Sequence, residues 1–293
     1  MGKKAFDEKL AGLVDEDEAG LRKALKDRSN YVAGRAATLL GERGFDAAVP
    51  DLLAAFERFF QDPGKSDPQC WAKNAIAAAL KGLGHREAAT YIRGIGHIQM
   101  EPVYGGKADT AMTLRGTCAL ALIDCPMTAI SILRHLTALL ADAEAGVRID
   151  AVRAITHLAD PSGLLLLRLK ALTGDSAPEV LGQCFSALLA CEAASDAVPF
   201  IERFLRSADT DTQLEAACAL AQSAEPQALD AVKHYWEDRL PTIEIRRAIL
   251  LNLGASPQRA AFDLLREVME TRPDLAATAR EALAASRFAR EAN

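Results

Sequence analysis

Aspartate recurs along the chain at a spacing that could place carboxylates in a row. The eight positions are Asp27, Asp67, Asp109, Asp142, Asp175, Asp209, Asp238 and Asp274, and the three central intervals are 33, 33 and 34 residues. Such a row could act on a ligand, or each carboxylate could cap the helix that follows it. A hydrophobic or small residue stands five positions after every one of them, which ties the aspartates to a repeated structural unit.

Six cysteines could also do chemistry, as disulfides or metal ligands. They stand at positions 70, 118, 125, 184, 191 and 218, and no two have the C-x2-C spacing. Cys118, Cys184 and Cys218 each come nine residues after a recurring Asp, and Cys125 and Cys191 share a second repeat position. Free cysteine behaves as a small hydrophobe that is readily buried. We therefore expect core cysteines, with no metal site and no cofactor.

Recognisable catalytic patterns are missing from the sequence. None of the five histidines is followed by Glu, and no H-E-x-x-H, Walker A or G-x-S-x-G pattern occurs. His157 falls beside the apolar stripe of a predicted helix, where a packed or solvated histidine is the simpler interpretation. We expect no catalytic residues and no enzymatic activity.

The net charge and the hydropathy of the chain argue against two classes of partner. A net charge of −6 argues against a broad nucleic-acid surface, which needs concentrated Lys and Arg. No stretch reaches the roughly 18 consecutive apolar residues of a membrane span. The N-terminal MGKKAFDEKL lacks the apolar core of a signal peptide. The sequence thus predicts a soluble cytoplasmic protein that binds neither membrane nor nucleic acid.

The elements that position these residues are predicted to be helices. Half of the chain is hydrophobic, only 5% is aromatic, and Ala and Leu are abundant. The clearest repeat runs Asp142, Val147, Arg148, Ala151, Ala154, Ile155 and Leu158, with apolar residues at helical steps of three and four. Further helices are predicted at Ile130–Leu140, Leu164–Leu172 and Val198–Leu205. Each repeat is then a two-helix hairpin, with the Asp at the N-cap of its second helix.

This pattern resembles the HEAT repeat, in particular the short bacterial HEAT-like form also found in phycobilisome (bilin) lyases. The matching residues are Asp142 with Val147, Arg148 and Ala151, and Asp109 with Leu114 and Arg115, and the resemblance spans residues 20 to 285. It implies an all-α, right-handed superhelix, a HEAT-like solenoid of about seven to eight helical hairpins. Residues 1–293 would form one solenoid, with an N-terminal cap at 1–26, repeats at 27–273 and a C-terminal cap helix at 274–293.

The resemblance also implies a hydrogen-bonded ladder of Asp and Arg between neighbouring repeats. Its members would be Asp109, Arg115, Asp142, Arg148 and Asp175, with Lys73 and Arg280 as further candidates. The Arg position holds Leu181, Glu215 and Glu244 in other repeats. Arg247 stands at a core position of the seventh repeat, so the register of that repeat stays open.

Two parts of the predicted solenoid are candidates for binding. The outward positions of the second helices are small or apolar, namely Gly116, Leu120, Ile123, Ile149, Arg153, Thr156, Gly182, Ser186 and Leu189. An exposed apolar patch favours a partner groove, although tight curvature or self-association would also bury these residues.

The second candidate is a pair of insertions. Residues 60–68 and 94–108 lengthen two adjacent repeats, so we expect them side by side on one edge. The longer insertion carries His97, Met100, Glu101, Tyr104 and Lys107, with Gly105–Gly106 as a hinge. Together with Trp71 it forms the predicted recognition site, against the alternative of a surface loop that tolerates insertion.

The sequence therefore predicts a non-catalytic scaffold that binds a protein or peptide through its concave face and the edge at residues 94–108. An enzyme-associated alternative is a bilin-lyase-like chaperone or, less favoured, a DNA glycosylase-like protein. The glycosylase needs a basic, aromatic concave face, whereas Lys73, Lys81 and Arg153 are scattered here. A third alternative is a homo-oligomer in which the groove holds another copy. The partner, its process and the oligomeric state do not follow from the sequence.

Overall fold

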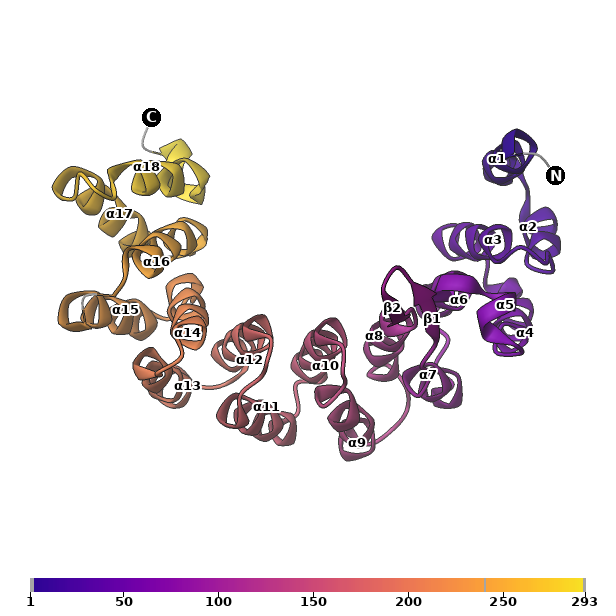
Figure 1. The fold of residues 1–293 in the computed structure, drawn as a ribbon, viewed down its shortest axis with the longest axis horizontal. Coiled ribbons are helices and arrows are strands. Elements are labelled where there is room, and N and C mark those ends of the chain that lie inside the picture. The colour runs from indigo at the N-terminus through magenta and orange to yellow at the C-terminus, as the bar shows by residue number, and fades with distance from the viewer. Residues whose placement is uncertain (1–2, 240, 292–293) are drawn as a thin grey trace. The chain divides into compact units, whose positions relative to one another are not determined.

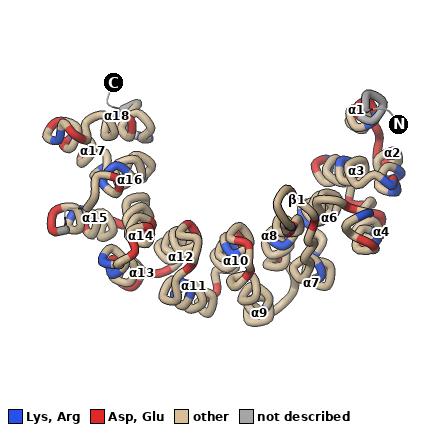
Figure 2. The backbone as a smooth tube through the Cα atoms, in the orientation of Figure 1, with Lys and Arg blue, Asp and Glu red and all other residues tan. Residues whose placement is uncertain are grey.

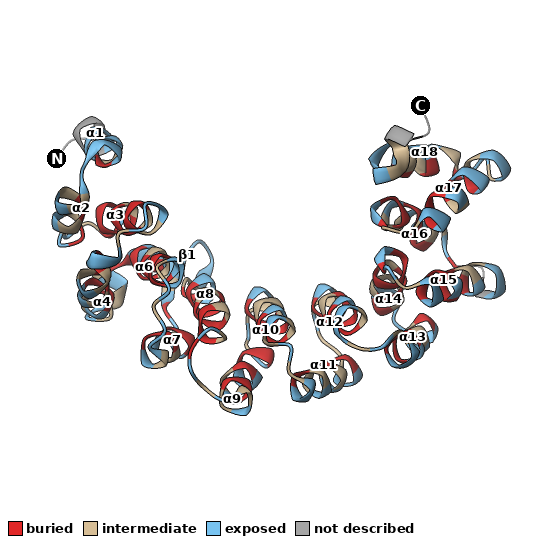
Figure 3. Cartoon of the chain, turned by 180° about the vertical axis from the view of Figure 1, so that it is seen from behind, coloured by how far each residue is buried: buried red, intermediate tan, exposed pale blue. Residues whose placement is uncertain are grey.

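The computed structural model describes residues 3–239 and 241–291, and the chain divides into two compact units, residues 1–158 and 159–293. Each unit is a stack of helical hairpins in which the helices form two rows (Figure 1). Buried residues lie where the rows face each other, as the red ribbon in Figure 3 shows. The predicted all-α solenoid of helical hairpins is confirmed. Within the described ranges, no helix is both long and apolar enough to cross a membrane.

The first unit contains ten helices in its described part. They are α1 (Lys3–Gly12), α2 (Glu18–Ala24), α3 (Asn30–Glu42), α4 (Val49–Arg58), α5 (Pro63–Ser66), α6 (Trp71–Gly82), α7 (Ala88–Ile95), α8 (Met112–Leu122), α9 (Ala129–Leu140) and α10 (Ala145–Leu158), with short 3-10 turns at Leu13–Asp15, Asp46–Ala48 and Pro68–Cys70. Helices α3, α6, α8 and α10 form one row, and α4, α7 and α9 form the other (Figure 1).

The second unit repeats this arrangement. Its helices are α11 (Pro161–Thr173), α12 (Pro178–Cys191), α13 (Ala194–Glu202), α14 (Thr210–Gln222), α15 (Pro226–Arg239), α16 (Ile243–Ala255), α17 (Arg259–Thr271) and α18 (Ala276–Ala285), with 3-10 turns at Arg203–Arg206 and Arg287–Glu291. Helices α12, α14, α16 and α18 form one row (Figure 1). The sequence-predicted helices at 130–140, 164–172 and 198–205 are confirmed as α9, α11 and α13 with its following turn.

The longer insertion is not the plain loop that the sequence analysis expects. It forms an antiparallel hairpin of β1 (Met100–Val103) and β2 (Gly106–Asp109), in which Glu101 pairs with Ala108 and Val103 with Gly106. Gly105 has φ of +87°, a conformation that glycine adopts without strain. Tyr104 and Gly105 form the turn of the β-hairpin, and Gly106 begins β2.

The recurring aspartates begin the second helix of a repeat, but mostly from outside the N-cap. In the regular repeats the carboxylate accepts a hydrogen bond from the amide two residues on, and the helix begins three residues after the Asp. These pairs are Asp27 with Ser29, Asp109 with Ala111, Asp142 with Glu144 and Asp175 with Ala177, at 2.8 to 2.9 Å. The N-cap expectation is corrected there to an Asx turn, in which the side chain mimics a backbone turn.

The sixth repeat is shifted by two residues from the predicted register. Ser207, not Asp209, takes the turn position: its hydroxyl accepts from the amide of Asp209 at 3.1 Å, and α14 begins three residues after it. Asp209 is a true N-cap and accepts from the Thr212 amide at 2.9 Å. Consequently Thr212 is buried, and Cys218 is half-exposed instead of sharing the buried position of Cys118.

The seventh repeat is shifted in the opposite direction. Asp238 lies inside α15, and α16 is capped by Thr242, whose hydroxyl accepts from the Ile245 amide at 3.4 Å. Ile245 and Ile249 are buried while Arg247 is exposed, so the expected core position was two residues too early. This register puts Arg246 at the Arg position. The pKa of Asp274 is lowered mainly by the hydrogen bond from Arg272, with a smaller contribution from the charge of Arg246.

Candidate functional site

A groove opens in the first unit between the β-hairpin and the row of α3, α6 and α8. One part of it is a cleft of about 780 Å³ whose lining includes Trp71, Asn74, Glu101, Val103, Ala108, Met112 and Thr113. A second part, of about 380 Å³, is lined by Leu10, Ala11, Val14, Tyr31, Arg35, Thr38 and Trp71. Because Thr38 and Trp71 line both parts, they form one continuous surface. We call it the hairpin groove.

An aromatic pair marks the junction of the two parts. The rings of Tyr31 and Trp71 lie 5.6 Å apart at 47°, and the two residues are 37% and 52% exposed. Gly34 makes room for the indole, because a Cβ at that position would lie 2.9 Å from Cδ1 of Trp71. A Trp with half of its surface in solvent is a typical anchor for a partner.

The hairpin is a fixed wall of the groove. The Glu101 carboxylate accepts from the Gln69 amide at 2.9 and 3.0 Å, which ties β1 to the turn before α6. Buried Gln99 donates its side-chain amide to the Asp67 carbonyl at 2.8 Å and its backbone amide to Asp109 at 3.0 Å. The second insertion lies beside the first, since the rings of Phe60 and His97 are 4.9 Å apart. The predicted adjacency of the two insertions is confirmed.

A buried ion pair and a strained turn lie under this wall. Lys73 Nζ is 3.0 Å from Asp67 Oδ2, and both side chains are fully buried. Asp67 also accepts from the Asn30 side chain and from the amides of Ala72 and Lys73 at 2.8 to 3.0 Å. The next residues, Gln69 and Cys70, have φ of 60° and 55°. Left-handed non-glycine residues persist where the surroundings hold them, and they are concentrated at functional sites.

The two faces of the hairpin differ in their relation to the groove. Successive side chains of a strand point to opposite faces, so Glu101, Val103 and Ala108 share one face, which lines the groove. On the opposite face, Pro102 and Asp109 also contribute to the lining, whereas Met100 and Lys107 do not. Tyr104 stands fully exposed at the tip. Of the predicted binding residues of this edge, Trp71 lies in the groove.

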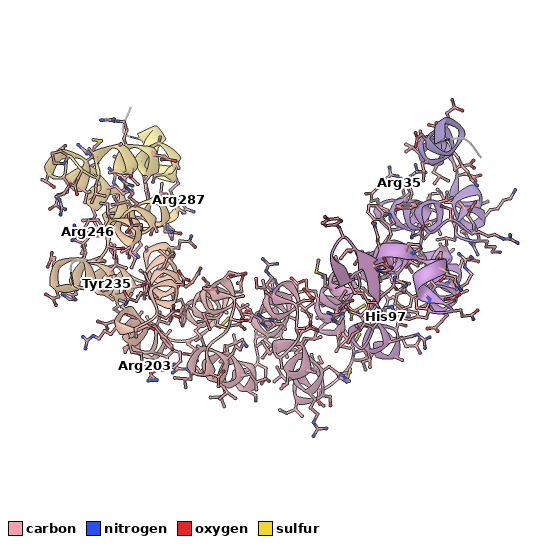
Figure 4. All side chains as sticks on the ribbon, in the orientation of Figure 1. Arg35, His97, Arg203, Tyr235, Arg246 and Arg287 are labelled. Carbon is pink, nitrogen blue, oxygen red and sulfur yellow. The ribbon has the colours of Figure 1, made fainter. Side chains whose placement is uncertain are left out.

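His97 is a packing residue. Its Nε2 lies 3.1 Å from the Gln99 side-chain oxygen, and its ring meets Phe60 edge-on. Burial lowers the pKa of His97 below its ordinary value, against an opposing contribution from Gln99. In Figure 4 His97 lies beside α7 and α8, whereas Arg35 lies on α3, where it lines the groove.

The predicted apolar face of the second helices is partly closed by packing. Leu120, Ile123, Ile149 and Leu189 are half-buried. The side chain of Asp150 in α10 occupies the space where Gly116 in α8 lacks a Cβ, and Glu215 in α14 does the same against Gly182 in α12. Exposed Arg153 pairs with Asp150 at 3.1 Å. Much of this face therefore contacts the next repeat.

The predicted ladder residues meet at Arg115. Its Nη1 lies 2.5 Å from Asp109 Oδ2, and its Nη2 donates to Asp142 Oδ1 of the following repeat at 3.0 Å. Burial opposes ionisation of Asp109, but hydrogen bonds from two backbone amides and from Arg115 outweigh it and lower its pKa. Arg148 donates to the carbonyls of Asp142 and Ala143 at 2.7 and 2.9 Å. Asp175 lies 2.7 Å from Lys170. Exposed Arg280 belongs to α18, and Asp274 pairs with Arg272 in the segment before that helix.

Sequence reasoning missed several groove residues, namely Val14, Tyr31, Arg35, Val103 and Met112. One signal was available: Gly-Gly between short segments is a hairpin signature, and a hairpin would have put Val103 and Glu101 on one face. The approach of Val14 and Tyr31 to Trp71 depends on the packing of α1 and α3, which no local pattern reports. In the described part of the chain, no group of three or more His, Cys, Asp or Glu is placed to hold a metal ion.

Part of the chain is similar to a known repeat family. Residues 197–284 match the family model of HEAT repeats. No curated protein matches the chain. Similar solved structures include human deoxyhypusine hydroxylase in complex with glycerol, at 18% identity and a TM-score of 0.33, covering 87% of this chain and 91% of that one. Another is the complex of CpcE and CpcF of phycocyanin lyase from Nostoc sp. PCC7120, at 18% identity and 0.34, covering 92% and 93%.

The fold and the repeat match define an α-solenoid built from helical hairpins. Within this solenoid, residues 197–284 are similar to HEAT repeats.

Proposed function

We propose that this protein binds a protein or peptide segment through the hairpin groove. The observation that carries the proposal is the set of large hydrophobic side chains exposed along this one surface: Val14, Tyr31, Trp71, Val103 and Met112, each 37% to 52% exposed. Leaving such side chains in water costs roughly 25 cal/mol per Å² of apolar area relative to burial. A contiguous patch of this kind is typical of an interaction site.

The rigidity of the groove supports the same function. The hairpin is fixed by the Glu101–Gln69 and Gln99–Asp67 hydrogen bonds, and α6 is anchored by the buried Asp67–Lys73 pair. A surface held in place before binding loses little conformational entropy when a partner docks. The groove is therefore organised to receive a segment without first folding around it.

The charge distribution favours a protein partner over a nucleic acid. Blue and red segments are interspersed along the helices of the first unit (Figure 2), and the net charge of the chain is −6. Phosphate recognition needs a continuous basic stripe. Around the groove, aromatic and aliphatic side chains dominate instead, which is the usual composition at the centre of a protein interface.

Affinity capture with two hairpin variants tests this function. The wild-type chain, Val103→Asp and Met100→Asp are immobilised and exposed to the same native lysate. Val103 is on the groove face and Met100 on the opposite face, so the two changes add the same charge on the same strand. We expect a protein that the wild type and Met100→Asp retain and that Val103→Asp loses. Equal capture by both variants would contradict a site in the groove.

A second copy of the chain is the alternative occupant. Light scattering across a concentration series separates the two cases. A dimer that Val103→Asp converts to a monomer would assign the groove to self-association.

A further inference from the structure

Arg35 is the basic residue of the hairpin groove. It projects from α3 one helical turn after Tyr31, so the guanidinium and the phenol ring are neighbours on the same helix face. It lines the groove with Trp71, and it is half-buried. Figure 4 shows it on the open side of α3. Among the residues that the structure describes, no acceptor or carboxylate pairs with it. Arg43, the C-cap residue of α3 about two turns further on, is by contrast engaged by the carbonyls of Val14 and Glu16.

The carboxylates that line the groove are already used within the chain. Glu101 accepts from the Gln69 amide and from the Gln99 side chain. Asp109 accepts from Gln99, Ala111 and Arg115. Their charges are balanced by fixed donors, so neither needs a cation from a partner. In the described part of the groove, the charge left for a partner to satisfy is the positive charge of Arg35.

We infer that the segment bound in the hairpin groove carries a carboxylate next to an aromatic or large aliphatic side chain; this deepens the proposed function and rests on it. The apolar side chain packs on the Tyr31–Trp71 pair, and the carboxylate accepts from the Arg35 guanidinium. The guanidinium presents two parallel N–H donors that match a carboxylate, and the adjoining apolar wall reduces the screening of this pair by water. A basic segment would instead meet like charge at the same position.

The hairpin edges indicate that the segment is recognised through its side chains. Pro102 has no N–H to offer along the outer edge of β1, and its cross-strand neighbour on β2 is exposed Lys107. Proline and lysine on a short edge strand are common means of preventing the addition of another strand. The partner therefore contacts side chains on the groove face of the hairpin and does not add a strand to the hairpin.

Selection from a random dodecapeptide library tests the inference. The library is displayed on phage and selected on the immobilised full-length chain, and selected peptides are then measured by fluorescence anisotropy. We expect enrichment of Asp or Glu within a few positions of Trp, Phe, Tyr or Leu. Arg35→Gln should weaken these peptides by about 10-fold or more, as expected for a lost hydrogen bond to a charged group. Selection on Arg35→Glu should instead enrich Lys and Arg.

Two controls make the outcomes distinct. Arg134→Glu changes the net charge by the same amount as Arg35→Glu, at an exposed position of α9 away from the groove, and should leave the affinity unchanged. Circular dichroism verifies the fold of each variant. Peptides that lose binding in Trp71→Ala but lack acidic residues, or bind Arg35→Glu equally well, would overturn the inference and leave the groove as a binding site. Absence of any enriched peptide that depends on Trp71 would overturn both.

Discussion

At the scale of single residues, the stack is joined by a few buried charges. Arg115 is almost inaccessible and connects Asp109 of its own repeat with Asp142 of the next. Removing one partner of such a pair leaves an unpaired charge away from water, which costs far more than the intact pair contributes. Asp109 also anchors the base of the hairpin through the Gln99 amide. One carboxylate thus supports both the repeat interface and the groove.

Asp109→Asn should destabilise the first unit in a pH-dependent way. The pKa of Asp109 is lowered in the folded protein, so its contribution is complete above the unfolded value of about 3.9 and is lost as the pH falls through the folded pKa. We expect a loss of about 3 kcal/mol at pH 7 that shrinks below about pH 4. Urea unfolding of the wild type and the variant at pH 7 and pH 3 measures this loss. A difference in unfolding free energy that stays constant with pH would contradict the lowered pKa of Asp109.

Glu215 should behave with the opposite sign. Burial, together with the nearby Glu179 and Asp211, raises the pKa of this carboxyl group in the folded state. The ionised form therefore costs stability as the pH rises from the unfolded pKa toward the folded one. Glu215→Gln should raise the thermal midpoint of the second unit at pH 7 and change it little near pH 4. Scanning calorimetry of the wild type and the variant at the two pH values measures this difference. A lower thermal midpoint for the variant than for the wild type at pH 7 would contradict the raised pKa of Glu215.

The cysteines should react in an order set by their burial. Cys191 is exposed, whereas Cys118 and Cys184 are fully buried, and burial raises the pKa of Cys184 to about 12. Thiolates are the reactive species, so buried thiols of raised pKa are inert. Maleimide labelling of the native chain followed by peptide mass mapping should modify Cys191 first. Early modification of Cys118 or Cys184 would show that these helices open readily.

At the scale of helices, the periodic pattern predicted the elements better than their register. The first five repeats follow the Asp-based register. Four of their aspartates make the same turn before the helix, and Asp67 instead accepts from the amides of Ala72 and Lys73. The sixth repeat uses Ser207 for that turn and the seventh is capped by Thr242. Ser and Thr hydroxyls can accept the same hydrogen bonds as Asp in a turn or at an N-cap. The register predicted from the aspartates alone is therefore wrong by two residues for both helices. The burial of Thr212 and Ile245 then reveals the actual alignment.

A close helix contact gives a test of packing in the second unit. A Cβ on Gly254 of α16 would lie 2.6 Å from the backbone oxygen of Ala282 in α18, which cannot move aside as a side chain can. Gly254→Ala should destabilise the unit by about 1–3 kcal/mol, as expected for overpacking. Gly82→Ala in α6, with no atom within 4 Å, is the matched control and should change stability by less than about 0.5 kcal/mol. Denaturant midpoints that do not separate the two variants would contradict the contact.

At the scale of the molecule, the repeat architecture could be predicted from the sequence, but the residues of the hairpin groove could be predicted only in part. Stacking follows from apolar periodicity, which a single sequence displays directly. The insertion at residues 94–108 was identified by the interrupted spacing, and Trp71 by its nearness to it. The side of the hairpin that faces the helices depends on the pairing of Glu101 with Ala108 and on the Glu101–Gln69 bond. The strand pairing is local, but the Glu101–Gln69 bond joins residues 32 apart in the sequence. The sequence alone therefore pointed to Met100, Tyr104 and Lys107.

Site-specific photo-crosslinking tests the central claim, that the hairpin groove binds a partner, most directly. A benzophenone amino acid is placed at Val103, at Met112 or, as the matched control, at Met100, and the full chain is irradiated in its native cells. Val103 and Met112 line the groove and Met100 does not. We expect one shared protein adduct from Val103 and Met112 and none from Met100. An adduct from Met100 alone, or equal yields at all three positions, would contradict this claim.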